Sequence, residues 1–241
     1  MTLSQAIAAA HAGEREGFVH LCEHTMPIAW LTAAVLGCSN IGTAVYQVYM
    51  RAEKSIVSLH SPSDLRVWLG HSMYPVLQET AAEHGIMISG LPEEADQAYQ
   101  IIAALPCEQR IALLTMCADG CSAAQAAELL DRPDIEVKRA VRAARQLTAA
   151  EMKKQGSTAN CNTGWLIAQF DCMKQTLDAQ TAPERARILD CIRQNIPYEA
   201  QETQNAWVET EQKETMTDAL KTEEKEKNGF FSKLFRSRRF G

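Results

Sequence analysis

The stretch "SAAQAAELLDRPDIEVKRAVRAAR" (residues 122–145) has the pattern of two helices separated by a tight turn. Ser122 is a residue type that caps helix starts, so a short helix is expected over 123–130. The turn is "DRPD", and Asp134 can cap the next helix after Pro133. A short helix, a tight turn and a longer helix in this order predict a helix-turn-helix.

The last helix of this stretch has two different faces. Val137, Val141 and Ala144 recur at i, i+4 and i+7 and predict a buried face. Lys138 and Arg142 open a second stripe one residue further on, which ends at Arg145 and has Arg139 beside it. Lysine and arginine neutralise phosphates, and arginine also pairs with guanine edges. The alternative is a solvated face of an ordinary amphipathic helix, but the preceding helix and turn favour DNA binding.

Charge is distributed unevenly along the chain. The 241 residues carry a net charge of −6, which argues against indiscriminate nucleic-acid binding. Residues 1–104 hold four basic and ten acidic side chains, and residues 199–227 are acidic. Aromatic residues make up only 6% of the chain, and long tracts rich in alanine and leucine favour helices. We therefore expect an all-α protein whose positive charge is concentrated in a few segments.

The remaining helices are outlined by proline, glycine and capping residues. Residues 2–37 show helical periodicity that should break at Pro27 and end at Gly37. A second helix, capped by Ser39 or Asn40, should run to about Leu59. The same reasoning gives a third helix from Leu65 that bends or stops at Pro75, a helix over 106–117 closed by Gly120, and two helices within 165–195.

These features predict two small helical domains followed by a helical appendage and a disordered tail. The linker between the domains is recognised by the glycines and the proline of "HGIMISGLPEEAD" (84–96). The expected segments are a first domain over 1–84, a linker over 85–97, the helix-turn-helix domain over 98–154, an appendage over 155–198, an acidic disordered tether over 199–227 and a basic-aromatic tip over 228–241.

The helix-turn-helix segment resembles region 4 of sigma-70 family RNA polymerase sigma factors of the small extracytoplasmic-function type. The matching positions are Leu105, Pro106, Gln109, Arg110, Gly120, Ser122, Ala127, Glu128, Leu130, Pro133, Val137, Lys138, Arg142 and Arg145. The resemblance implies that this domain contacts a promoter element of the −35 type. The residues expected to do so are Ser122, Gln125, Lys138, Arg139, Arg142 and Arg145.

The N-terminal block is similar to region 2 of the same family. The matching positions are Ala10, Gly13, Glu14, Gly17, Phe18, Leu21, Val45, Tyr49, Met50, Arg51 and Ala52, together with "DLRVWL" at 64–69. In this family, region 2 binds the polymerase clamp and opens the promoter. The resemblance implies a polymerase-binding surface made by Tyr46, Gln47, Tyr49, Met50 and Arg51.

The block departs from the family pattern where promoter opening would be located. Acids and a Gln-Glu pair usually precede the Tyr49 match, and this chain has neutral residues there. Pro75, Glu79, Ala82 and Glu83 stand where the family has Asn, Asp and a basic cluster. A surface that holds a single strand needs positive charge and exposed aromatic side chains. The departures therefore favour DNA contact by the second domain over promoter melting by the first.

Two functions follow from these observations. The first is a sigma factor that binds core RNA polymerase and promoter DNA, with an anti-sigma protein as a further partner. The alternative is an interaction protein built on the sigma fold, which binds a polymerase, a regulator or a membrane surface without opening promoters. Neither needs a cofactor, and we find no nucleophile–base pair, phosphate loop or metal cluster that would predict an enzyme.

The C-terminal tip, "NGFFSKLFRSRRFG" (228–241), combines large apolar side chains with cations. The residues in question are Phe230, Phe231, Leu234, Phe235 and Arg236. This composition suits a peripheral membrane anchor or a peptide that docks in a partner groove, and a solubilising tail is the third alternative. We expect a cytoplasmic protein with mostly buried, reduced thiols, no signal peptide and no transmembrane helix.

Overall fold

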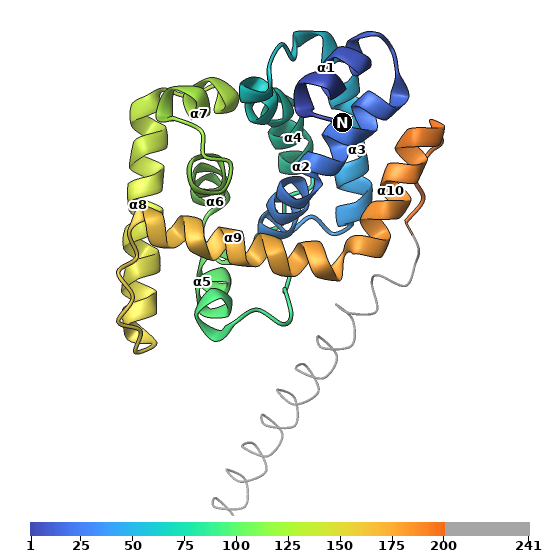
Figure 1. Cartoon of the computed structure of the whole chain (residues 1–241). Coiled ribbons are helices and arrows are strands. Elements are labelled where there is room, and N and C mark those ends of the chain that lie inside the picture. Colours follow the sequence, from blue (N-terminus) through green and yellow to red (C-terminus); the bar gives the residue numbers. More distant parts are fainter. Residues whose placement is uncertain (201–241) are drawn as a thin grey trace, which may run out of the picture. The chain divides into compact units, whose positions relative to one another are not determined.

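The computed structural model describes residues 1–200, which form ten α-helices and no strand (Figure 1). This confirms the all-α prediction. Met1–Tyr198 form one compact unit. The two blocks expected as domains, 1–84 and 98–154, both lie within this unit. The expectations for the tether and for the tip with Phe230, Phe231, Leu234, Phe235 and Arg236 fall, from residue 201 on, outside the described residues.

The helices follow one another with short connections. The first half contains α1 (Leu3–His11), α2 (Arg15–Leu36), α3 (Ile41–Glu53), the 3-10 turns η1 (Ile56–Ser58) and η2 (Pro62–Asp64), and α4 (Leu65–Glu79). The second half contains α5 (Glu93–Ala103), α6 (Cys107–Leu113), the π-helical turn η3 (Leu114–Ala118), α7 (Ala123–Leu130), α8 (Asp134–Lys154), α9 (Thr163–Gln180) and α10 (Ala182–Gln194).

Both prolines that were expected to interrupt helices lie inside continuous ones. Pro27 is within α2 and Pro75 within α4. A proline deprives the carbonyl four residues earlier of its hydrogen bond. Those carbonyls belong to Glu23 and His71, two exposed residues, so water can take the place of the missing donor. The break in the first segment comes instead at Gly13, whose φ of +81° separates α1 from α2.

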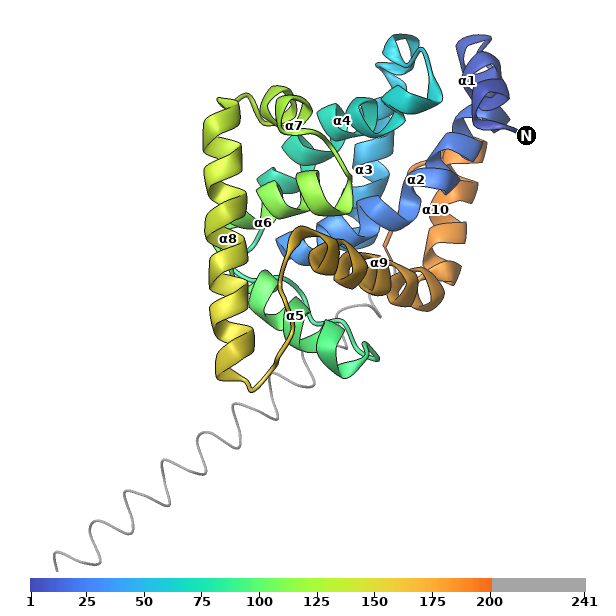
Figure 2. The same ribbon diagram turned by 60° about the vertical axis from the view of Figure 1, so that its left-hand side comes forward.

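Helix α2 is the central element of the described unit. Most of its residues are buried, and it packs against α1, α3, α4, α9 and α10, with further contacts to α5 and α6 (Figures 1 and 2). It ends at Gly37 in the left-handed conformation, as expected. Asn40 then caps α3 by accepting a hydrogen bond from the Thr43 amide. Helix α3 ends at Glu53, short of the expected Leu59.

A buried arginine joins the second half of the unit to the end of α2. Arg110 of α6 is fully buried, and its guanidinium donates to the carbonyl oxygens of Val35, Ala82 and Glu83 at 2.9, 2.6 and 3.0 Å. The last carbonyls of a helix carry partial negative charge, so the C-terminus of α2 is a favourable place for this cation. The Gln-Arg pair matched in the sequence thus includes a structural residue.

A second junction connects α4 to the turn that follows η3. The Tyr74 hydroxyl donates a 2.5 Å hydrogen bond to Asp119, and Arg66 donates to the Asp119 backbone carbonyl. Burial raises the pKa of Asp119 from 3.8 to about 7, against the opposing effects of the Tyr74 hydrogen bond and the positive charges of Arg66 and Lys174. Close by, Gly70 of α4 lies against Leu129 of α7, which brings the helix-turn-helix onto α4.

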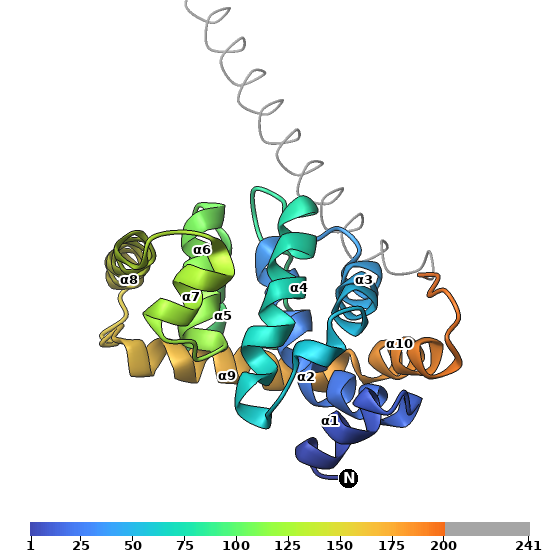
Figure 3. The same ribbon diagram turned by 90° about the horizontal axis from the view of Figure 1, so that it is seen from above.

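Helix α9 runs along the unit and contacts both halves. It packs on α2 and α10 on one side and on α5 and η3 on the other, with α8 and α10 at opposite ends of the arrangement (Figures 1 and 3). The predicted appendage, 155–198, therefore consists of two helices that pack on both sequence blocks. Its loop contributes Cys161 to a small core cluster with Ile101 and Met152.

Candidate nucleic-acid interface

Helix α7 begins with a complete capping box. The Ser122 hydroxyl accepts from the Gln125 amide at 3.3 Å, and the Gln125 side chain accepts from the Ser122 amide at 2.9 Å. This reciprocal pair satisfies two backbone donors at the helix start. Both residues are exposed, as a DNA contact requires, but these two hydrogen bonds already engage them in the start of α7. The helix covers 123–130, as expected from the sequence.

The turn between α7 and α8 is a Schellman motif with an unusual residue. Asp131 adopts the left-handed conformation (φ 48°, ψ 50°), and the amides of Asp131 and Arg132 donate to the carbonyls of Glu128 and Ala127. Glycine is the usual residue at this position because other side chains strain there, although aspartate tolerates it better than most. Pro133 then occupies the N-cap position of α8 without a side-chain hydrogen bond, and Asp134 is the first residue of the helix rather than its cap.

The faces of α8 agree with the sequence pattern. Val137, Val141 and Ala144, and Thr148 and Met152 further along the helix, are buried on the side of α8 that packs on α5, α6 and α7. The basic residues Lys138, Arg139 and Arg142 are exposed on the opposite face. Helix α8 stands at the edge of the unit, so this face is open along its length (Figure 2). The three side chains form the exposed basic stripe of α8.

Arg145 differs from the other members of the predicted set. It is only partly exposed, and its Nε is buried without a hydrogen-bond partner. Burial raises the pKa of the nearby Cys117 thiol to about 11, and the positive charge of Arg145 acts in the opposite direction. Arg145 therefore leans toward η3 rather than standing in the exposed stripe. A two-faced helix pattern cannot reveal this, because position 145 lies on the border between the two faces.

The exposed basic surface is longer than the predicted site. Lys153 lies eleven residues after Arg142, which is close to three helical turns, so both side chains share a face of α8. Lys153 and Lys154 are exposed at the C-terminal end of the helix. The eleven-residue spacing is the signal that would have found Lys153.

Acidic side chains surround the start of the basic stripe. Lys138 forms an ion pair with Asp134 at 2.7 Å, and this hydrogen bond holds the pKa of Asp134 below its ordinary value. Glu136 is also exposed in the first turn of α8. These acids favour the helix dipole but oppose phosphate. Arg139 and Arg142, further along the stripe, form no ion pair with any of the described residues and are the better candidates for phosphate contact.

The predicted polymerase-binding residues on α3 differ in how far they are buried. Gln47 and Arg51 are exposed and Met50 is half-buried. Tyr49 is fully buried, and its hydroxyl lies 3.1 Å from that of Thr25 in the core. Tyr46 is partly covered, because its hydroxyl donates to the Ile196 carbonyl at 3.0 Å and its ring lies 5.9 Å from that of Tyr198. The set therefore does not form one open surface.

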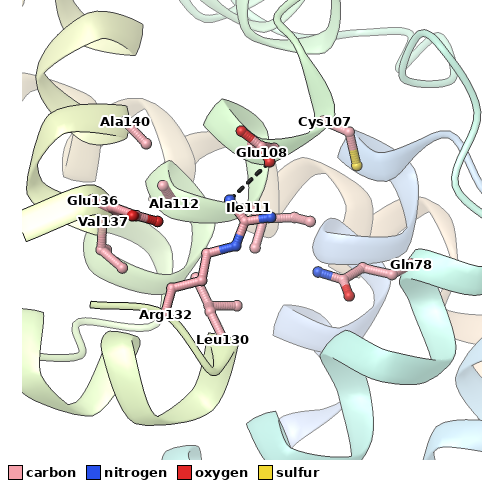
Figure 4. Close-up of a pocket in the computed structure, with 10 residues that line it drawn as sticks. All are labelled: Gln78, Cys107, Glu108, Ile111, Ala112, Leu130, Arg132, Glu136, Val137 and Ala140. Carbon is pink, nitrogen blue, oxygen red and sulfur yellow. Dashed lines mark ion pairs between the residues drawn. The ribbon is translucent and has the colours of Figure 1, made fainter. Parts of the chain in front are cut away.

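A pocket of about 260 Å³ lies beside the α7–α8 turn (Figure 4). Its apolar wall includes Ile111, Leu130 and Val137, and an ion pair of 2.8 Å between Arg132 and Glu108 stands within it. Sites for drug-sized ligands are usually about 300–1,000 Å³. This pocket is smaller than that range, and its lining includes the charged side chains of Glu108, Arg132 and Glu136.

Other chemistry is sparse among residues 1–200. All eight cysteines are free, and five of them are buried, which confirms the expectation of mostly buried thiols. No three His, Cys, Asp or Glu side chains in this part of the chain are grouped so that they could hold a metal ion. None of the described helices is both long enough and apolar enough to cross a membrane.

Comparison with protein-family models, with curated proteins and with solved structures found no match to this chain.

Proposed function

We propose that this protein is a sigma-like transcription factor that reads DNA with α7 and α8 and binds core RNA polymerase. The observation that carries the proposal is the exposed basic stripe of α8, placed directly after a short capped helix and a tight turn. Helix-turn-helix proteins place such a second helix in the major groove, and lysine and arginine on its open face meet phosphates and base edges.

The resemblance to region 4 of sigma factors adds the polymerase partner and the type of promoter element. Several matched positions have structural roles that suit this comparison. Ser122 caps α7, Gly120 adopts a positive φ of 71°, and Val137 lies on the buried face of α8. These contacts hold α8 in place while its outer face stays free. The polymerase partner itself rests on the resemblance in sequence.

The alternative function, an interaction protein that no longer opens promoters, is favoured by a separate observation. Residues 1–104 contain only Arg15, Arg51, Lys54 and Arg66 as cations. Arg15 is paired with Glu53, and Arg66 donates to the Asp119 carbonyl. A single strand of DNA would find little positive charge on this block. Binding to duplex DNA through α8 is compatible with both functions, and promoter opening separates them.

The first experiment is run-off transcription with purified core RNA polymerase on a library of genomic upstream fragments. Defined transcripts that require the protein would support the sigma function. The same fragments are then used in equilibrium binding without polymerase, with Arg139→Glu/Arg142→Glu as the test variant. Because two phosphate-binding charges are reversed, we expect affinity to fall by about 100-fold.

The matched control is Lys153→Glu/Lys154→Glu, which makes the same change of charge at the far end of the same helix. We expect this control to weaken binding less, because the N-terminal part of a recognition helix is the part that enters the groove. Equal losses in the two variants would mean that α8 attracts DNA only by its total charge. Unchanged binding in the Arg139→Glu/Arg142→Glu variant would rule out DNA reading by α8.

A further inference from the structure

The part of the described unit that follows α9 covers one side of α3. We call residues 182–198, which comprise α10 and the segment after it, the strap. Helix α10 contacts α2 and α3, and the segment after it places Tyr198 on α3 (Figure 3). The side of α3 that is covered includes Gly42 and Tyr46. Tyr46 is one of the residues that the sigma resemblance implies for polymerase binding.

The contact between the strap and α3 is specific. A Cβ built on Gly42 would lie 2.5 Å from the Tyr198 hydroxyl oxygen and 3.1 Å from the adjacent ring carbon. Tyr198 therefore occupies the space that a side chain at position 42 would need. On the neighbouring turn of α3, Tyr46 stacks at a tilt against the Tyr198 ring and donates to the Ile196 carbonyl. An aromatic ring and one backbone carbonyl thus fill this surface.

The strap has few apolar anchors for its length. Ile188, Ile192 and Tyr198 are its buried residues, and the rest of it is exposed or partly exposed. Polar groups make up much of the remaining attachment. Arg15 of α2 donates to the Ile192 carbonyl at 2.5 Å and to the Asn195 side chain at 3.3 Å. Arg193 pairs with Glu16 across 2.9 Å, and both side chains are largely open to water.

One buried group opposes the closed position of the strap. The Tyr198 hydroxyl is buried and has no hydrogen-bond partner among the described residues. A hydroxyl that loses water without gaining a partner weakens the contact that buries it. The strap is therefore held by three buried apolar side chains and by polar contacts that are exposed or only partly buried, against the cost of a desolvated hydroxyl. This is the composition of a contact that can open and close, rather than of a core.

We propose that the α3 surface formed by Gly42 and Tyr46 is a docking surface that the strap occupies from within the chain, and that core RNA polymerase binds there only when the strap has left. The inference rests on the proposed function, because that function supplies the partner. A binding-competent state that is only partly populated lowers the apparent affinity in proportion to its population. The strap thus acts as an intramolecular competitor of the polymerase.

Two variants of the full chain should move the strap in opposite directions. Gly42→Ala places a methyl group where the Tyr198 hydroxyl lies, so it should expel the strap while leaving α3 a good helix. Tyr198→Phe removes the unpartnered hydroxyl and should hold the strap more firmly. Ile196→Ala is the matched control, because this side chain belongs to the strap but is 45% exposed.

Two measurements are made on each variant. Amide hydrogen exchange of residues 182–198 reports opening without any partner, and binding to purified core RNA polymerase reports competition. For Gly42→Ala we expect faster exchange in the strap and, if one molecule in ten is open before the change, an affinity about tenfold higher. Tyr198→Phe should show slower exchange and weaker binding, and Ile196→Ala should match the unmodified chain.

The outcomes separate the inference from the function beneath it. Unchanged exchange in Gly42→Ala would show that Tyr198 does not hold the strap on α3, and the inference would be wrong. Faster exchange with unchanged polymerase affinity would also overturn it, while the polymerase would remain a partner that binds elsewhere. If no variant binds the polymerase even with an open strap, the polymerase part of the proposed function fails, and the partner assigned to this surface fails with it.

Discussion

The outer faces of α8 and of α3 were both predicted from the sequence to be binding surfaces, but they differ in exposure to solvent. Lys138, Arg139 and Arg142 of α8 are open to solvent. On α3, Tyr49 is in the core and Tyr46 lies under the strap. Helical periodicity shows which face of a helix is apolar, but it cannot show what packs on a mixed face. A charged stripe resists burial, whereas a tyrosine can be covered at little cost when its hydroxyl finds an acceptor, as that of Tyr46 does.

The largest effect is expected at Arg110, which holds the half that contains α8 to the half that contains α3. Arg110→Ala leaves three backbone carbonyls without their donor and opens a cavity. We expect the free energy of unfolding to fall by about 5 kcal/mol, measured by urea denaturation. Arg132→Ala breaks only the exposed ion pair to Glu108 and should cost less than about 1 kcal/mol. Similar losses in the two variants would contradict a structural role for Arg110.

The second effect concerns pH and the junction between α4 and the helix-turn-helix. Since the pKa of Asp119 is raised to about 7 from 3.8, the folded chain binds more protons than the unfolded chain between these values. Below about pH 4 this carboxyl therefore adds about 4 kcal/mol to the free energy of unfolding. This contribution is lost as the pH rises toward 7.

The measurement is urea denaturation across this pH range for the unmodified chain and for Asp119→Asn. The difference in unfolding free energy between the two should change with pH in the direction given, because asparagine does not titrate. Tyr74→Phe removes the hydrogen bond that favours the ionised form, so it should shift the transition to higher pH. A pH-independent difference between the unmodified chain and Asp119→Asn would exclude the raised pKa.

The third prediction concerns DNA binding by the exposed basic stripe of α8. Neutralising two cations of the stripe in Arg139→Gln/Arg142→Gln should make binding less sensitive to salt. If both side chains contact phosphates, the slope of log affinity against log salt concentration should become about 2 units shallower. The measurement is DNA binding over a salt series, and an unaltered slope would place the phosphate contacts on other residues.

The smallest effect is expected at the turn that orients α8. Asp131→Gly relieves the left-handed backbone and should raise the free energy of unfolding by about 0.5–1 kcal/mol. Asp131→Ala should lower it, because alanine tolerates this conformation less well than aspartate. Thermal or urea denaturation of the two variants gives opposite signs under this account. A loss of stability in the glycine variant would mean that the aspartate side chain itself supports the turn.

Much of the helix-turn-helix could be predicted from the sequence because its determinants are local. Helix α7 has the expected bounds since Ser122 and Gln125 cap it within one turn, and Gly37 and Gly120 end their helices in the left-handed conformation. The charged face of α8 also follows from periodicity alone. In the candidate site, Lys138, Arg139 and Arg142 could be predicted once the helix and its apolar face had been recognised.

The rest depended on residues far apart in the chain. Pro27 and Pro75 remain inside helices because the carbonyls they deprive of a donor belong to exposed residues, and no local rule states on which side water will lie. Arg110 is buried because the end of α2 and the segment after α4 together offer three carbonyls to it. Tyr198 reaches Gly42 across 156 residues of sequence. The sequence by itself determined the helices, their caps and the charged face of α8, since these follow from neighbours within a few residues. Only the tertiary structure decided which faces stay open, because burial depends on what the rest of the chain places against them.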